Sequence, residues 1–109
     1  MAAYLQKVPA LDLVLDHGRH QVTRASLTTN SFRGKCRLWQ ILTELCKRYD
    51  DYYPVRDLRV AVWEDYPAEE GTVWGAVCEV RRKLLPLELT IVHEKGIGYR
   101  LEDLRKQSG

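Results

Sequence analysis

The sequence lacks the features of secreted and membrane-spanning proteins. It has only three cysteines, an odd number, so a disulfide-stapled scaffold is not expected and a reducing compartment is. No apolar stretch approaches the ~18–20 residues that a membrane-spanning helix needs. The first residues do not have the basic-then-apolar layout of a signal peptide. These absences predict a cytoplasmic protein with no membrane partner.

Signals of catalysis and of metal binding are also missing. The cysteines show no Cys-x-x-Cys spacing, and neither His17 and His20 nor His93 has a metal-ligand pattern near it. The sequence contains no nucleophile elbow and no phosphate-binding loop. We therefore expect no enzymatic activity, no metal and no cofactor.

What is present is the composition of one ordinary globular domain. The chain has 109 residues, of which 45% are hydrophobic and 29% charged, and it contains no repeat and no low-complexity run. A chain of this length has room for a core but not for two domains. We expect a single domain over residues 1–109.

The charges are unevenly distributed along the chain. Residues 1–49 have eight Lys/Arg and three Asp/Glu, residues 50–70 have two and seven, and residues 71–109 have seven and five. The net charges of these segments are therefore +5, −5 and +2. Two interpretations are open: a basic face that binds a polyanion beside an acidic stretch for another partner, or a solvated surface of mixed sign.

The first third of the chain has the pattern of short β-strands. Residues 11–16 alternate apolar and polar side chains, residues 19–25 do so less cleanly around Val22, and residues 27–32 are rich in threonine. The pattern predicts a small antiparallel sheet over about residues 11–32.

The middle of the chain has the spacing of three amphipathic helices. The first is predicted from near Gly34 to before Asp50, the second begins at Pro54, and the third runs from about Thr72 to about Leu85. The apolar stripes that predict them are Leu38, Ile41, Leu42 and Leu45; Val55, Leu58 and Val62; and Val73, Val77, Val80 and Leu84.

Two apolar runs close the chain. Residues 87–94 and 97–102 are separated by Lys95 and Gly96, which favours a β-hairpin, and the polar residues 103–109 are expected to fray. A sheet, three helices and a hairpin in segregated order predict the α+β class and a winged helix-turn-helix. In that fold the last helix enters the DNA major groove, and the hairpin, or wing, contacts the adjacent minor groove or backbone.

Four short motifs occur in one order along the chain. They are LWQIL at 38–42, VRDL at 55–58 followed by Val-Trp at 62–63, TV at 72–73 followed by VRRKL at 80–84, and GIGYR at 96–100. Together, over residues 38–102, they resemble the OmpR/PhoB-type effector domain of bacterial response regulators. The resemblance implies a sequence-specific double-stranded DNA-binding domain of a transcriptional regulator. Family members normally carry a receiver domain, for which 109 residues leave no room, so the chain is either an excised domain or a stand-alone relative.

The resemblance also implies which residues contact DNA. The outward face of the third helix has Gly75, Glu79 and Arg82, and it is flanked by Ala76, Cys78 and Arg81. Family members commonly have polar or basic residues at the outward positions. The neighbouring Arg81 and Arg82 match the basic pair that holds the phosphate backbone. The full set of candidate DNA-binding residues is Arg33, Lys35, Arg37, Trp63, Thr72, Trp74, Gly75, Ala76, Cys78, Glu79, Arg81, Arg82, Lys95 and Tyr99.

Several of these residues on the third helix have two interpretations. Glu79 either accepts a hydrogen bond from cytosine in the major groove or pairs with Lys83 on the helix surface. Gly75 either permits close approach to a backbone or simply weakens the helix. Trp74 either packs against the loop before its helix, which we favour, or anchors a partner.

The remaining candidates lie outside the third helix. Lys95 keeps the charge of the wing-tip arginine that family members insert into the minor groove. Trp63 and Tyr99 are interpreted mainly as core rings, with a phosphate contact as the alternative. The cluster of Arg33, Lys35 and Arg37 either neutralises phosphates or is a solvated helix entrance.

Two further interactions are open. The acidic loop over residues 64–71, with Glu64, Asp65, Glu69 and Glu70, either contacts RNA polymerase, as the resemblance implies, or is a polar loop. The fairly apolar surface of Trp74, Gly75, Ala76 and Cys78 favours an alternative function, a winged-helix protein-interaction or homodimerisation module with weak or lost DNA binding.

Overall fold

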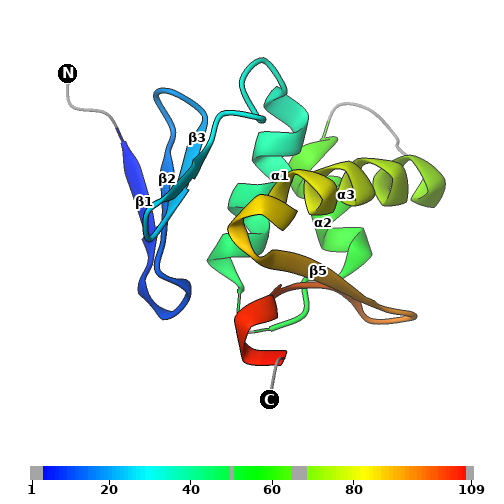
Figure 1. The fold of residues 1–109 in the computed structure, drawn as a ribbon. Coiled ribbons are helices and arrows are strands. Elements are labelled where there is room, and N and C mark those ends of the chain that lie inside the picture. The colour runs from blue at the N-terminus through cyan, green and yellow to red at the C-terminus, as the bar shows by residue number, and fades with distance from the viewer. Residues whose placement is uncertain (1–3, 50, 65–68, 108–109) are drawn as a thin grey trace.

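The computed structural model describes residues 4–49, 51–64 and 69–107. An amino-terminal antiparallel sheet is followed by three helices and a carboxy-terminal hairpin, which confirms the predicted α+β winged-helix architecture (Figure 1). The elements are β1 (Leu5–Val8), β2 (Leu13–Asp16), β3 (Gln21–Arg24), β4 (Leu27–Thr29), α1 (Cys36–Lys47), α2 (Val55–Val62), α3 (Glu70–Leu84), β5 (Leu89–Glu94) and β6 (Gly98–Asp103). Short 3-10 turns occupy Pro9–Leu11, Leu85–Leu87 and Leu104–Gln107.

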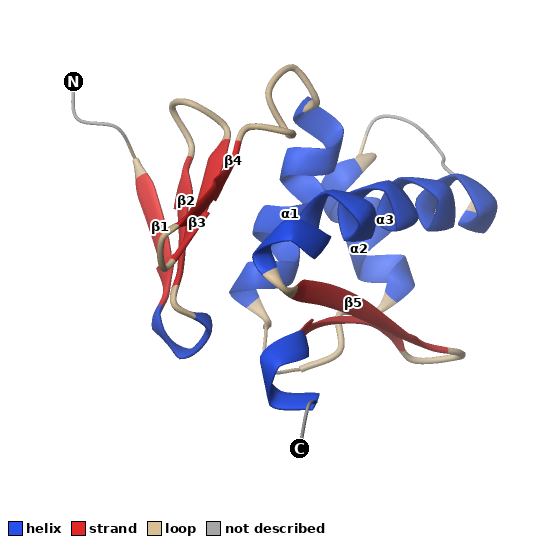
Figure 2. Ribbon diagram, viewed as in Figure 1, coloured by secondary structure: helices blue, strands red, loops and turns tan. Residues whose placement is uncertain are grey.

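The amino-terminal sheet has four strands in the order β1-β2-β3-β4, each antiparallel to its neighbour (Figure 2). Leu13, Leu15 and Val22 are buried in the core, and the residues between them are more exposed, as the alternation predicts. The predicted first strand is wrong at its start, because residues 9–11 form a 3-10 turn. Strand β1 precedes that turn and was not predicted, since only Val8 of its four residues is buried and the alternation is weak.

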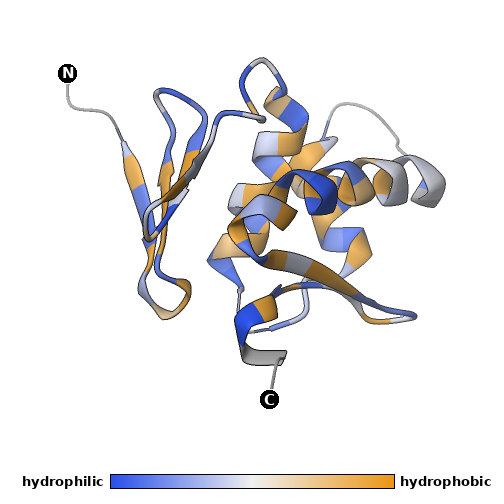
Figure 3. Cartoon of the chain, viewed as in Figure 1, coloured by the Kyte–Doolittle hydropathy of each residue, from blue (hydrophilic) through white to orange (hydrophobic). Residues whose placement is uncertain are grey.

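The helices bury the stripes that the spacing predicts, except that Val55 at the start of α2 is half-buried. Ile41 and Leu42 of α1 and Val73 and Val80 of α3 have no exposed surface, and each such side chain contributes about 1.5–3 kcal/mol of burial free energy. Helix α3 begins at Glu70, slightly before the predicted start. Figure 3 shows hydrophobic and hydrophilic residues alternating along the strands and around the helices, as this burial requires.

The sheet contacts α1 through a group of aromatic rings around Trp39. The His20 ring stacks on the indole at 4.9 Å between centroids, and the His17 ring meets it edge-on at 5.4 Å. The indole N–H donates to Nδ1 of His17 over 3.2 Å, and Nε2 of His17 lies 2.9 Å from Oε1 of Gln6. The two histidines therefore serve the packing of the sheet against the first helix.

The wing is a regular hairpin of β5 and β6. Its turn is closed by a hydrogen bond from the Ile97 amide to the Glu94 carbonyl, with Gly96 at φ +83° in the left-handed region that glycine tolerates. The predicted fraying from residue 103 is wrong at its start, since Asp103 ends β6 and is only 8% exposed. Residues 108–109 of the predicted tail lie outside the described residues.

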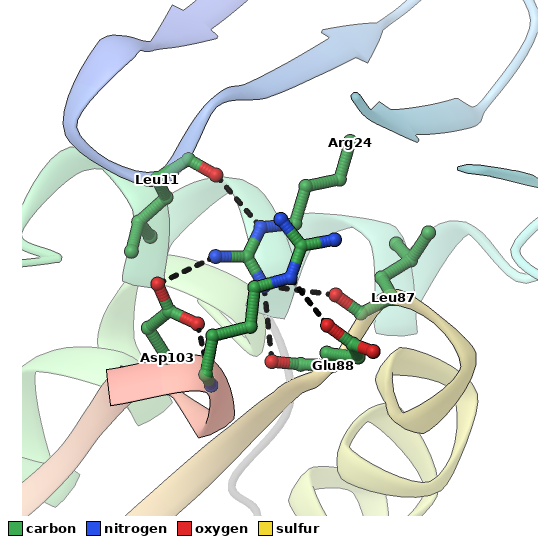
Figure 4. Close-up of polar contacts among 6 residues, drawn as sticks. Leu11, Arg24, Leu87, Glu88 and Asp103 are labelled. Carbon is green, nitrogen blue, oxygen red and sulfur yellow. Dashed lines mark hydrogen bonds and ion pairs between the residues drawn. The ribbon is translucent and has the colours of Figure 1, made fainter. Parts of the chain in front are cut away.

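A buried arginine explains why Asp103 is ordered. The Arg24 side chain, 2% exposed, pairs with the Asp103 carboxylate at 2.6 Å and donates to the carbonyl oxygens of Leu11, Leu87 and Glu88 at 2.8–3.0 Å (Figure 4). These partners come from the turn after β1, the turn after α3 and the end of β6. No local pattern in the sequence predicts this network, which ties the amino-terminal sheet to the wing.

A second close contact positions the wing against α2. Tyr53 and Tyr99 exchange two backbone hydrogen bonds, of 2.6 and 3.0 Å, in an isolated antiparallel bridge just before the second helix. A β-carbon on Gly98 would overlap the Tyr53 carbonyl, and the residue has φ +153°. Gly98 therefore allows a close backbone approach that holds the start of α2 beside the wing.

Candidate nucleic-acid interface

The orientation of α3 agrees with the predicted stripe. With Val73, Val77 and Val80 in the core, the opposite face presents the residues predicted to face outward. Thr72, Gly75, Arg81 and Arg82 are exposed, and Ala76, Cys78 and Glu79 are half-buried.

The charged residues of this face are not neutralised by neighbours. In the described part of the chain, no ion pair involves Arg81, Arg82 or Glu79, so the pairing of Glu79 with Lys83 is not observed. The Arg81 guanidinium lies 5.8 Å from the centroid of the Trp74 ring. Two cationic side chains are thus available to solvent on the outer surface of α3.

Trp74 packs against the wing. Its ring lies 5.1 Å from the His93 ring on β5 and 6.1 Å from the Tyr99 ring on β6, and those two rings stack on each other at 4.7 Å. Residues 65–68 of the loop before α3 lie outside the described residues, so the expected packing of Trp74 against that loop stays a prediction beside the observed wing contact. The indole remains 39% exposed.

The stacked rings form part of a groove of about 630 Å³ between the starts of α2 and α3 and the wing. The wing tip and the amino-terminal end of α3 lie on the same side of the molecule (Figure 1). The groove is lined by Pro54, Val55, Arg56, Gly71, Trp74, His93, Lys95, Gly96, Ile97 and Tyr99. Arg56, His93 and Ile97 were not among the predicted site residues, because only the fold brings them beside Trp74.

Two aromatic candidates lie in the core. Trp63 is 6% exposed and Tyr99 is 2% exposed, so both agree with their interpretation as core rings. The Arg37 guanidinium lies 5.3 Å from the centroid of the Trp63 ring.

The basic cluster at the start of α1 is open to solvent. Arg33, Lys35 and Arg37 are all exposed, and none of them forms an ion pair with any residue that the structure describes. Arg33 also borders a polar hollow of about 490 Å³ beside the β2–β3 turn. This cluster adds positive charge at the entrance to α1.

The acidic loop is only partly described. Glu64 and Glu69 are exposed, whereas Asp65 and the side chain of Glu70 lie outside the described residues. Glu69 precedes the first residue of α3, so the loop ends earlier than predicted.

The segment before α2 is held on α1 by a buried phenol. The Tyr53 hydroxyl donates to Oε1 of Glu44 over 2.7 Å. Burial and this contact with Glu44 raise the pKa of Tyr53 to about 12, so the phenol stays a neutral donor. Burial acts to raise the pKa of Glu44, but the hydrogen bonds from Lys47 and Tyr53 outweigh it and lower that pKa.

Among the residues that the structure describes, no group of three or more His, Cys, Asp or Glu side chains is arranged to hold a metal ion. None of the helices within those ranges is long and apolar enough to cross a bilayer.

Comparison with known proteins relates the chain to others by structure alone. No protein-family model and no curated protein sequence matches it. Among solved structures, the DNA-binding domain of E. coli CadC is similar with a TM-score of 0.72, over 94% of this chain and 95% of that chain, at 17% sequence identity. At this identity the similarity is one of fold. The chain therefore has the winged-helix fold, with an amino-terminal sheet in front of the three helices and the wing.

Proposed function

We propose that this chain is a double-stranded DNA-binding domain of an OmpR/PhoB-type transcriptional regulator, without catalytic activity of its own. The observation that carries the proposal is that Arg81, Arg82 and Lys95 are exposed and unpaired among the described residues, on α3 and on the wing beside it. The similar fold of the CadC DNA-binding domain supports it.

The proposed complex follows from the placement of α3. An α-helix fits the major groove of B-form DNA, and the outward face of α3 is available for this contact. Arg81, Arg82 and Lys95 then pair with phosphates, and the wing lies at the adjacent minor groove. Arg33, Lys35 and Arg37 supply further phosphate contacts at the start of α1.

The acidic loop serves a different kind of partner in this proposal. Glu64 and Glu69 are exposed carboxylates, which repel a phosphate backbone and attract a basic protein surface. A contact with RNA polymerase through this loop would leave the basic surfaces free for DNA.

A salt series on duplex binding tests the proposal. The logarithm of the binding constant should fall linearly with the logarithm of salt concentration, because neutralised phosphates release counterions. Replacing both Arg81 and Arg82 by alanine should weaken binding to every duplex and reduce the slope by about two. Lys7→Ala is the control, since Lys7 is exposed on edge strand β1, across the molecule from α3 (Figure 1). A double variant that binds like the wild type would exclude a phosphate role for the two arginines.

A second candidate function is supported by exposed apolar side chains. Trp74 is 39% and Ile97 is 53% exposed, and both line the groove beside the wing. A homodimer formed through this surface would bury them. Sedimentation distinguishes the candidates: a dimer that Trp74→Ala dissociates, in a protein with no duplex affinity at low salt, would favour the interaction module.

A further inference from the structure

Residues 75–79 on the outward face of α3 have little with which to read bases. Gly75 and Ala76 have no polar side-chain atoms, and the Cys78 thiol is a weak donor. The Glu79 carboxylate repels phosphate, and its only base partner of the usual kind is the cytosine amino group. The strong donors on the surface of α3 are therefore Arg81 and Arg82 in its last turn.

The groove between the wing and the starts of α2 and α3 has further donors. Among its lining residues, those that can carry charge are Arg56, His93 and Lys95, and no carboxylate lines the described part of the groove. Arg56 and Lys95 are exposed, and neither forms an ion pair within the described ranges. Two free cations from different elements, α2 and the wing, line one groove and are complementary to an anionic chain.

The groove also has an aromatic and aliphatic wall. Trp74 is held in place by the His93 and Tyr99 rings, and Ile97 projects at 53% exposure from the wing. The Trp74 indole N–H has no acceptor among the residues that the structure describes, so it is free to donate. Flat apolar surface beside cations fits the sugar and phosphate of a nucleotide unit. A volume of about 630 Å³ is large enough for one.

We propose that this groove holds the sugar–phosphate backbone of one strand of duplex DNA. Phosphates pair with Arg56 and Lys95, and a deoxyribose packs on Trp74 and Ile97. The proposal rests on the proposed DNA-binding function and deepens it. Contacts to sugar and phosphate do not distinguish bases directly, so this domain binds duplexes with little dependence on sequence.

The test compares groove variants with matched controls by fluorescence anisotropy, on two labelled duplexes of equal length and unrelated sequence at low salt. Arg56→Ala should weaken binding about tenfold and reduce the salt slope by about one. Arg59→Ala is its control, because Arg59 lies on the same helix outside the groove. Trp74→Leu should also weaken binding about tenfold. Glu79→Gln removes a carboxylate that repels phosphate, so it should not weaken binding, and neither duplex should become preferred.

A second measurement uses the wild-type protein, so that the test of Trp74 does not depend on whether Trp74→Leu folds. Trp39 and Trp63 are 4% and 6% exposed, so Trp74 is the tryptophan that acrylamide can reach. Saturation with duplex should protect the fluorescence from acrylamide.

Three results would overturn the inference. Unchanged acrylamide quenching in a saturated complex would show that Trp74 is not covered. Binding that survives Arg56→Ala and Trp74→Leu, or a strong preference for one duplex that Glu79→Gln removes, would place the contact on the outward face of α3 and leave the proposed function intact. A wild-type protein that binds neither duplex at low salt would overturn both.

Discussion

A side chain at position 98 has no space. A β-carbon there would overlap the Tyr53 carbonyl and approach the α-carbon of Pro54 at 2.9 Å, and both contacts are with backbone that cannot rotate away. Gly98→Ala should therefore lower the free energy of unfolding by about 2–4 kcal/mol through overlap and backbone strain. Urea denaturation measures this change. A loss below ~0.5 kcal/mol would show that the Tyr53–Tyr99 bridge is looser than described.

Gly75 provides the matched control, because a β-carbon there meets no atom within 4 Å. It lies inside α3, where alanine is favoured over glycine by up to about 1 kcal/mol. Gly75→Ala should therefore stabilise the protein. If DNA binding is unchanged in the stabilised variant, the glycine serves no close approach to a DNA backbone. If binding is lost while stability rises, Gly75 faces DNA at short range.

At the scale of elements, the packing of the amino-terminal sheet against α1 depends on the charge state of His17. Nδ1 of His17 accepts a hydrogen bond from Trp39, so it cannot carry a proton in this arrangement. Burial lowers the pKa of His17 below its ordinary value of 6.5, and repulsion from His20 and Lys47 lowers it further, while Asp16 opposes them.

This depressed pKa predicts a pH dependence of stability. Between the folded pKa of His17 and about 6.5, the unfolded chain binds more protons than the folded one. The contribution of His17 to stability is therefore complete above about pH 6.5 and is lost as the pH falls toward the folded pKa. Urea midpoints measured from pH 7.5 to 5 should fall through this window.

The matched control for the pH series is His93→Gln, since His93 is exposed on the wing. His17→Gln should reduce the fall of the urea midpoint between pH 7.5 and 5, and His93→Gln should leave that fall unchanged. Equal slopes in the wild type and His17→Gln would assign the pH dependence to other groups.

At the scale of the whole molecule, Arg24 joins parts of the chain that the sequence separates widely. Its partner Leu87 is 63 positions away, and Asp103 lies on the last strand. Replacing Arg24 by methionine should cost about 3–5 kcal/mol, because it removes the cation that pairs with a buried carboxylate and the donor that three carbonyl oxygens share. Urea unfolding followed by circular dichroism and by tryptophan fluorescence measures the loss and shows whether sheet and helices still unfold together.

Arg105→Ala is the comparison for this variant. Arg105 pairs with Glu88 on the surface, where solvent screens the interaction, so its removal should leave the unfolding midpoint almost unchanged. If Arg24→Met is no more destabilised than Arg105→Ala, the buried network does not hold the sheet to the wing.

The amino-acid sequence alone determined the parts of this protein that depend on local spacing. The apolar stripes of α1 and α3 and the glycine turn of the wing are read from residues a few positions apart, because helix and hairpin periodicity is a local property. The exposure of Arg81 and Arg82 followed from the same periodicity.

The tertiary structure alone decided the features that need residues far apart in the sequence to come into contact. The sequence gives no sign that Arg24 is buried, that Asp103 is ordered, or that Arg56 and Trp74 share a groove with the wing, since each partner set is assembled from separate elements. Burial of an ion pair and the shape of a groove are set by packing between elements, and a local pattern carries no information about that packing.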